Sequence, residues 1–174
     1  MAIDFTLEPE LEEIRLRVRA FVNEVVKPGE AKLDAIRDDD RAEYLKILID
    51  MRKEALAAGL WMPHMPKDWG GMGLGHVQLA MVQAEAAKAG YGPWVLNCQA
   101  PDEGNMHTLL HWGTPEQKEK YLRPLCDGTA MSCFAMTEPE VAGSDPTLIR
   151  TTAVQDGDEW VANGHKWFIS NARR

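Results

Sequence analysis

The stretch SCFAMTEPEVAGSDPT, residues 132–147, combines residue types that could line a flat polar ligand. Phe134–Met136 is apolar and suits an extended backbone, and a proline then fixes a corner. Gly143 and Ser144 follow in a loop with little side-chain bulk, so backbone N–H and C=O groups can approach a ligand closely. With the hydroxyls of Thr137 and Ser144, this surface suits an uncharged heterocycle that forms hydrogen bonds around its rim. A plain strand-to-loop transition explains these residues equally well.

Two other groups of residues are weaker candidates for chemistry. The glycine cluster Trp69–Gly75 lacks the Gly-Lys-Ser/Thr ending of a P-loop, and a GxGxxG frame starting at Gly71 has His76 at its last glycine. We interpret this cluster as a tight interhelical loop. His107 and His111 lie four residues apart in an expected helix, but no Glu lies between them as in HExxH. We therefore predict no metal site.

The composition is that of an acidic chain with enough apolar residues for a core. The chain has 174 residues, of which 45% are hydrophobic and 26% are charged, and its formal net charge is −8. A chain of this size can bury roughly 70% of its unfolded surface without disulfides or metals. The acidic balance argues against nucleic acid or anionic lipid as a non-specific partner. No window approaches the roughly 18 uninterrupted apolar residues of a membrane span.

The cysteines indicate a reducing compartment. Cys98, Cys126 and Cys133 are an odd number without paired spacing, and the N-terminus does not resemble a signal peptide. We therefore expect buried, reduced thiols in a cytoplasmic protein.

Helical periodicity dominates the first two-thirds of the chain. A first helix is expected from a cap at Thr6 to Pro28-Gly29, because its apolar residues recur at a spacing of three and four. Gly59 should end a second helix, whose inner face we expect to hold Tyr44, Leu45, Leu48, Met51 and Leu56. Further helices are expected over about 77–88, 97–110 and 114–127. The last begins with Thr114-Pro115-Glu116-Gln117, which combines an N-cap, an initial proline and a capping-box Gln.

Short strands replace helices after Gly128. Strands are expected over 130–136, 151–154, 160–162 and 166–170, with Asp156-Gly157-Asp158 as a hairpin turn. The expected fold is mainly α, with an N-terminal helical bundle over 1–128 and the first strands of an antiparallel β domain over 129–174. So few strands cannot bury a sheet face and its edges. We therefore expect a longer protein or a partner that completes the sheet, and self-association of the 174 residues alone.

Four segments, in order, resemble signatures of the acyl-CoA dehydrogenase family. Residues 134–145 resemble its T-E-P-x-A-G-S-D loop with one extra residue, and Asn163–Asn171 resembles its G-x-K-x-W-I-T-N strand. Upstream, Gly113–Leu122 resembles the G-(S/T)-x-E-Q-K-x-x-Y-L helix, and Trp69–Gly73 resembles the Y-G-G-x-G loop. The stretch NCQAPDEGNM and the extra residue in EPEVA are most similar to a branch that some animals carry fused to a kinase-like domain. That branch favours longer acyl chains.

The resemblance implies a truncated form of a three-part enzyme. The family has an N-terminal helical domain, a middle β domain and a C-terminal four-helix bundle, with FAD between the domains, and it acts as a homodimer or homotetramer. It removes the α-proton of an acyl-CoA with a Glu base and passes the β-hydride to flavin N5. Electrons usually leave to an electron-transferring flavoprotein. The implied activity is dehydrogenation of medium- to long-chain acyl-CoA in fatty-acid β-oxidation.

The resemblance also implies which residues bind FAD, and Ser144 would in addition contact the acyl-CoA. Phe168 stands where the family has Trp, which keeps a stacking surface but loses an N–H donor. No acidic residue matches the catalytic base, so no catalytic residue is assigned and the chain alone is expected to be inactive. The alternatives are an acyl-CoA oxidase and a non-catalytic partner subunit of a flavoenzyme. The implied FAD-binding residues are Phe134, Ala135, Met136, Thr137, Gly143, Ser144, Phe168, Ile169 and Ser170.

Overall fold

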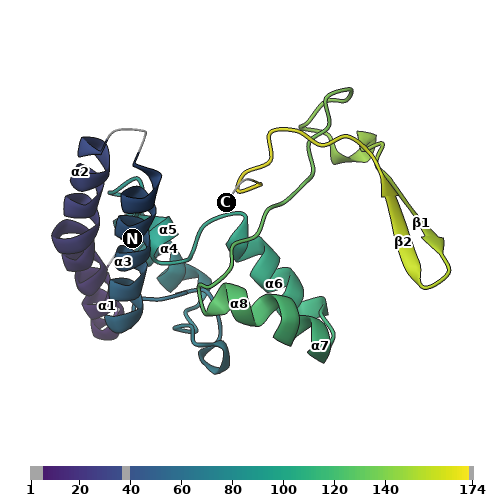
Figure 1. Cartoon of the computed structure of the whole chain (residues 1–174). Coiled ribbons are helices and arrows are strands. Elements are labelled where there is room, and N and C mark those ends of the chain that lie inside the picture. The colour runs from purple at the N-terminus through teal and green to yellow at the C-terminus, as the bar shows by residue number, and fades with distance from the viewer. Residues whose placement is uncertain (1–5, 37–39, 173–174) are drawn as a thin grey trace, which may run out of the picture. The chain divides into compact units, whose positions relative to one another are not determined.

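A computed structural model describes residues 6–36 and 40–172 (Figure 1). Contacts divide the chain into two compact units, Met1–Ala130 and Met131–Arg174. The first unit is helical, and the second carries a two-stranded antiparallel sheet. The expected fold class is therefore confirmed. Among the described residues, no helix is both long enough and apolar enough to span a bilayer.

The first unit begins with a long helical rod. α1, Pro9–Phe21, runs through the π-helical turn Val22–Val26 into α2, Lys27–Ala35 (Figure 1). The expected cap at Thr6 is wrong, because the helix starts at Pro9, which fits the first turn, and no side chain caps it.

The rod continues through Pro28, so the expected helix end at Pro28-Gly29 is also wrong. The N–H of Lys27 bonds to the carbonyl of Val22, five residues back, which shifts the hydrogen-bond register immediately before the proline. Pro28 then lies in the first turn of α2, where a missing N–H costs little. A π-turn thus absorbs a residue that would interrupt a regular α-helix.

α3, Arg41–Ala57, ends as expected, and its expected inner face is confirmed in part. Gly59, with a φ of 67°, follows its C-terminus in the left-handed region that favours glycine. The buried residues of α3 are Leu48, Met51, Arg52 and Ala55. Leu45 and Leu56, expected on the inner face, are exposed because they lie on the flank of this stripe.

The rest of the first unit consists of short helices. α6 starts at Asp102 rather than near Asn97, because Asn97 adopts a φ of 53° that no helix accommodates. The expected capping box is confirmed, with Gln117 N–H donating to Thr114 Oγ1 at 3.3 Å and Thr114 N–H donating to Gln117 Oε1 at 2.9 Å. The elements are the 3₁₀ turn Lys67–Trp69, α4 His76–Ala86, α5 Gly92–Val95, α6 Asp102–Trp112, α7 Pro115–Gln117, the π-turn Lys118–Leu122 and α8 Arg123–Cys126.

The core of the first unit encloses a charged residue. The guanidinium of Arg52 lies over the rings of Trp61 and Trp94, 4.7 and 4.5 Å from their centroids. It donates to the carbonyl of Trp94 at 3.0 Å and to Asn97 Oδ1 at 3.1 Å. Burial lowers the pKa of Arg52 only to about 10, so its charge is retained at neutral pH.

The second unit contains one hairpin. β1, Thr152–Asp156, pairs with β2, Glu159–Asn163, and Val154 lies opposite Val161. The expected hairpin turn is confirmed, with Gly157 at a φ of 60°. Both strands are exposed along their whole length.

Two expected strands, 130–136 and 166–170, do not form, which corrects the prediction. Both are extended in part, but a strand needs a ladder of backbone partners. The structure records no backbone hydrogen bond between 130–136 and 166–170. Trp167 N–H instead donates to the carbonyl of Thr137, one residue beyond the first range. The apolar residues of these two ranges therefore indicated a propensity for extended backbone, but not the neighbouring strand that a sheet requires.

Candidate cofactor-binding site

The two segments expected to line a flavin lie side by side in the second unit. Trp167 N–H donates to the Thr137 carbonyl at 3.2 Å, and Asn171 Nδ2 donates to the Ser132 carbonyl at 3.0 Å. These bonds join residues about 30 to 40 positions apart in the sequence. The structure thus brings together the segments 132–137 and 166–171, which we name the first and second site segments.

Both site segments present aromatic rings to the surface. Phe134 is 62% exposed and Phe168 is 85% exposed. The ring of Trp167 lies against that of Phe168, with centroids 4.8 Å apart and planes inclined at 52°. Phe168 has a φ of 51°, an uncommon conformation for a bulky residue that is often found at functional positions. Exposed ring faces of this kind suit stacking with a planar heterocycle.

Small and hydroxyl residues belong to the same two segments and to the loop that packs on them. A Cβ on Gly143 would lie 3.2 Å from Thr137 Cγ2, so the glycine lets its loop pack closely on the first site segment. Ser144 and Ser170 are exposed. Within 6–36 and 40–172, the structure records no hydrogen bond from the hydroxyls of Thr137, Ser144 or Ser170. Apolar faces with hydroxyls beside them fit the chemistry of a flavin ring.

The remaining expected site residues differ in exposure. Ala135 is exposed, whereas Met136 and Ile169 are half-buried. The carbonyl of Met136 accepts a hydrogen bond from Lys166 Nζ at 2.9 Å. Met136 and Ile169 therefore contribute to the packing of the site segments as well as to their surface.

Glu138 belongs to this region, and the sequence analysis gave it no role. It is 3% exposed, and its carboxylate accepts hydrogen bonds from Thr151 Oγ1 at 2.5 Å, Arg150 N–H at 2.7 Å and Lys166 Nζ at 2.9 Å. These donors, the Thr151 hydroxyl first, lower the pKa of Glu138 to about 2. The signal that could have revealed it is an acidic residue beside a proline corner, with a lysine in the later motif.

Histidine and cysteine clusters offer no comparable site. The rings of His64 and His107 lie 5.1 Å apart, and those of His107 and His111 lie 6.1 Å apart. In the described part of the chain, no three His, Cys, Asp or Glu side chains are arranged to hold a metal ion. Cys98 is a buried free thiol, as expected, but the expectation of burial is wrong for Cys133, which is exposed.

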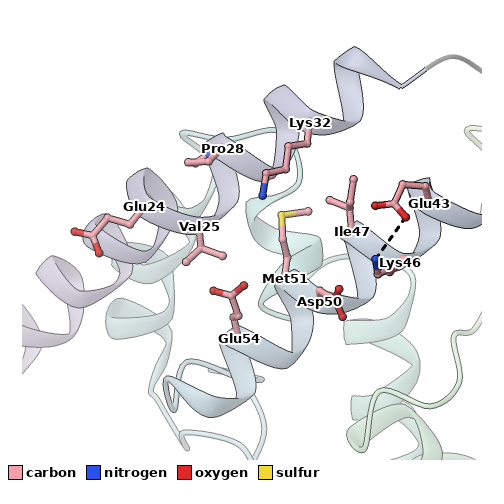
Figure 2. A pocket seen from close by; sticks show the side chains of 11 residues that line it. Glu24, Val25, Pro28, Lys32, Glu43, Lys46, Ile47, Asp50, Met51 and Glu54 are labelled. Atoms are coloured by element: carbon pink, nitrogen blue, oxygen red, sulfur yellow. Dashed lines mark ion pairs between the residues drawn. The ribbon is translucent and has the colours of Figure 1, made fainter.

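A pocket between α2 and α3 contains none of the expected site residues. Figure 2 shows Lys32 of α2 and Met51 and Glu54 of α3 among the side chains that line it. Lys46 and Glu43 form an ion pair there at 3.6 Å. Carboxylates outnumber lysines among the residues that line it, and nothing in the described part of the structure indicates a ligand there.

Both units match domains of one family. Residues 8–129 match the N-terminal domain of acyl-CoA dehydrogenases, and residues 133–174 match their middle domain. The human protein "Acyl-CoA dehydrogenase family member 11" is 39% identical over 166 residues, a match that covers 92% of this chain and 21% of that protein. The FadE2 protein of Mycobacterium tuberculosis, assigned as an acyl-CoA dehydrogenase, is 37% identical over 173 residues, which cover 98% of this chain and 42% of that protein. The chain thus spans well under half the length of these relatives.

Solved structures show the same relationship. A Mycobacterium abscessus protein assigned as an acyl-CoA dehydrogenase superposes with a TM-score of 0.85 at 38% identity, over 95% of this chain and 43% of that one. A glutaryl-CoA dehydrogenase from Mycobacterium smegmatis, solved in complex with FADH2, superposes with a TM-score of 0.69 at 27% identity, over 94% of this chain and 39% of that one. The expected similarity to an animal branch is confirmed by the human relative. The two domain matches and these relatives together show that the chain belongs to the acyl-CoA dehydrogenase family.

Proposed function

We propose that this chain is part of an FAD-dependent enzyme that introduces an α,β double bond into a medium- to long-chain acyl-CoA during fatty-acid β-oxidation. The observation that carries the proposal is the pairing of the two site segments, which bear the exposed rings of Phe134 and Phe168. A similar structure from Bacillus anthracis contains FAD, with a TM-score of 0.71 at 26% identity.

The chain's own residues would bind and orient the flavin. Phe168 would stack on the ring, while the hydroxyls of Thr137 and Ser170 would donate hydrogen bonds to its polar edge. Bound FAD would accept the hydride that leaves the β-carbon of the substrate. Donors fixed at that edge before the reaction stabilise developing negative charge without reorganisation. Ser144 would contact both the cofactor and the acyl-CoA.

The described residues of the site include no suitable base for the α-proton. Glu138 is the buried carboxylate of the site, and its low pKa and its hydrogen bonds to Thr151 and Lys166 make it a poor proton acceptor. We therefore propose that the base lies outside these residues and that the 174-residue chain alone does not reduce flavin with acyl-CoA.

Partners follow from the same proposal. We propose that the complete protein forms a homodimer or homotetramer and passes electrons to an electron-transferring flavoprotein. A structure titled as the electron-transferring flavoprotein of Acidaminococcus fermentans contains a chain similar to this one, with a TM-score of 0.68 at 29% identity. Location in the cytoplasm stays a prediction.

The proposed function is tested by measuring FAD binding to the complete polypeptide that contains these residues. The Phe168→Ala variant should bind FAD about fivefold more weakly, because it loses a stacking surface worth about 1 kcal/mol. Trp160→Ala is the matched control, since it removes an exposed ring from the hairpin outside the site segments. Flavin fluorescence measures both affinities. A wild-type protein without affinity for FAD, or equal losses in the two variants, would contradict the proposal.

A further inference from the structure

We propose that Glu138 and Lys166 are positioning residues, which hold the two site segments at the separation that the flavin requires. This inference rests on the proposed function and extends it to two side chains to which the family resemblance assigned no role. Neither residue needs to touch the cofactor.

Lys166 joins the two site segments through one ammonium group. Its Nζ donates to the Met136 carbonyl at 2.9 Å and to Glu138 Oε1 at 2.9 Å. These two acceptors flank Thr137, which is expected to contact the flavin. Lys166 itself precedes Phe168 by two residues. Its ammonium group therefore sets the distance between Thr137 and Phe168, the two positions expected to face the flavin.

Glu138 closes the loop that contains Gly143 and Ser144. Its Oε2 accepts from Arg150 N–H at 2.7 Å, and its Oε1 accepts from Thr151 N–H at 2.8 Å and from Thr151 Oγ1 at 2.5 Å. The loop between residues 138 and 151 is therefore fastened at both ends by one carboxylate. Hydrogen bonds of this charge-assisted kind are among the strongest in proteins and fix geometry well.

Gly164 allows the second site segment to reach this carboxylate. A Cβ at Gly164 would clash with the side chain of Thr151. The chain can therefore pass closely over Thr151 and bring Lys166 onto Glu138 only with glycine at this position. Arg150, Thr151 and Lys166 lie 12, 13 and 28 residues from Glu138 in the sequence, and all three donate to its carboxylate. The arrangement therefore depends on the fold and not on a local turn.

The test uses the complete polypeptide and three substitutions. Glu138→Gln removes the negative charge and replaces one acceptor oxygen with an NH2 donor, which weakens the hydrogen bonds to this side chain. Lys166→Met removes the ammonium group and its hydrogen bonds. Both substitutions nearly keep the size of the side chain. Glu140→Gln is the matched control, since Glu140 is a nearby exposed acid whose recorded contact is with His165 at 3.7 Å. Hydrogen–deuterium exchange of the apoprotein reports on the Arg150 and Thr151 amides, and flavin fluorescence reports the Kd for FAD.

We expect faster exchange at both amides in Glu138→Gln, and an increase of about tenfold or more in the Kd for FAD in both site variants. The control should match the wild type in both measurements. If the wild type binds FAD and both site variants bind it with the same Kd as the wild type, the positioning role is overturned. This holds even if the amides exchange faster. Unchanged amide exchange in Glu138→Gln would overturn it too. Wild-type protein that binds no FAD would instead overturn the proposed function, and this inference with it.

Discussion

At the scale of single residues, His64 illustrates how burial makes a side chain sensitive to acid. It is 6% exposed, and within the described part of the chain neither ring nitrogen has a hydrogen-bond partner. Burial, together with neighbouring His107, lowers the pKa of His64 to about 4. The folded state therefore holds the neutral ring, whereas the unfolded chain takes up a proton near pH 6.5.

The predicted consequence is a loss of stability between pH 6.5 and pH 4. The unfolded state binds more protons in this window, so the free energy of unfolding should fall by up to about 3 kcal/mol as the pH decreases. His64→Phe should remove this part of the pH dependence, whereas His76→Gln, at an exposed position, should leave it unchanged. Urea unfolding at pH 7 and pH 4.5 measures the difference. The same pH dependence in His64→Phe and wild type would refute this role.

Residue types predicted local features better than distant contacts. The Thr114–Gln117 capping box was predictable because both partners lie within one helical turn. The burial of Arg52 was not, because its acceptors Trp94 and Asn97 lie more than 40 residues away. Through the family resemblance, Thr137 and Phe168 are expected at a flavin surface, and this assignment stays a proposal. The sequence indicated no role for Glu138.

At the scale of elements, a buried carboxylate joins α1 to α4. Glu85 of α4 accepts from Arg15 and Arg19 of α1 at 2.7 Å each, and from Lys88 at 2.6 Å. These partners, Arg19 first, lower the pKa of Glu85 to about 2. The stability that its charge contributes is therefore present above about pH 4.5 and is lost as the pH falls toward 2.

Glu85→Gln should lower the free energy of unfolding by about 1–3 kcal/mol at pH 7, because it removes the carboxylate that Arg15 and Arg19 share. Arg15 keeps its ion pair with Glu12, whereas Arg19 loses its carboxylate partner. The difference from wild type should shrink as the pH falls below 4. Glu13→Gln on the exposed side of α1 is the control and should change stability little. Thermal unfolding followed by circular dichroism measures both. A Glu85→Gln variant as stable as the control would argue against this link between helices.

Element boundaries were predictable where a local signal decides them. Gly59 follows the end of α3 as expected, because glycine adopts its φ of 67° without steric cost. The helix end predicted at Pro28 was wrong, because the preceding π-turn shifts the backbone hydrogen bonds by one residue and the helix continues through the proline. A similar turn precedes Pro124, where Arg123 N–H bonds to the Lys118 carbonyl five residues back. The two missing strands show that sequence indicates extended propensity but not the neighbours that a strand requires.

At the scale of the whole molecule, the chain carries a hairpin with two uncovered faces. Val154, Trp160 and Val161 are all exposed, and the edges of β1 and β2 have no neighbouring strand within the described residues. Exposed apolar edges of this kind favour pairing between chains.

We therefore predict that the 174-residue polypeptide self-associates at micromolar concentration and that Val161→Lys shifts it toward monomer. The charge opposes pairing at an exposed position, while the hairpin turn stays intact. Val161→Ile is the control, since it keeps an apolar side chain and should self-associate like the wild type. Sedimentation velocity distinguishes these states. Monomeric wild-type chain at all concentrations would contradict the prediction.

The two site segments should form one face of a flavin site. The most direct measurement is a crystal structure of the complete polypeptide with bound FAD. The isoalloxazine ring should stack on Phe168, with the hydroxyls of Thr137 and Ser170 within hydrogen-bonding distance of its polar edge. A flavin bound elsewhere, with no contact to residues 132–137 or 166–171, would contradict it.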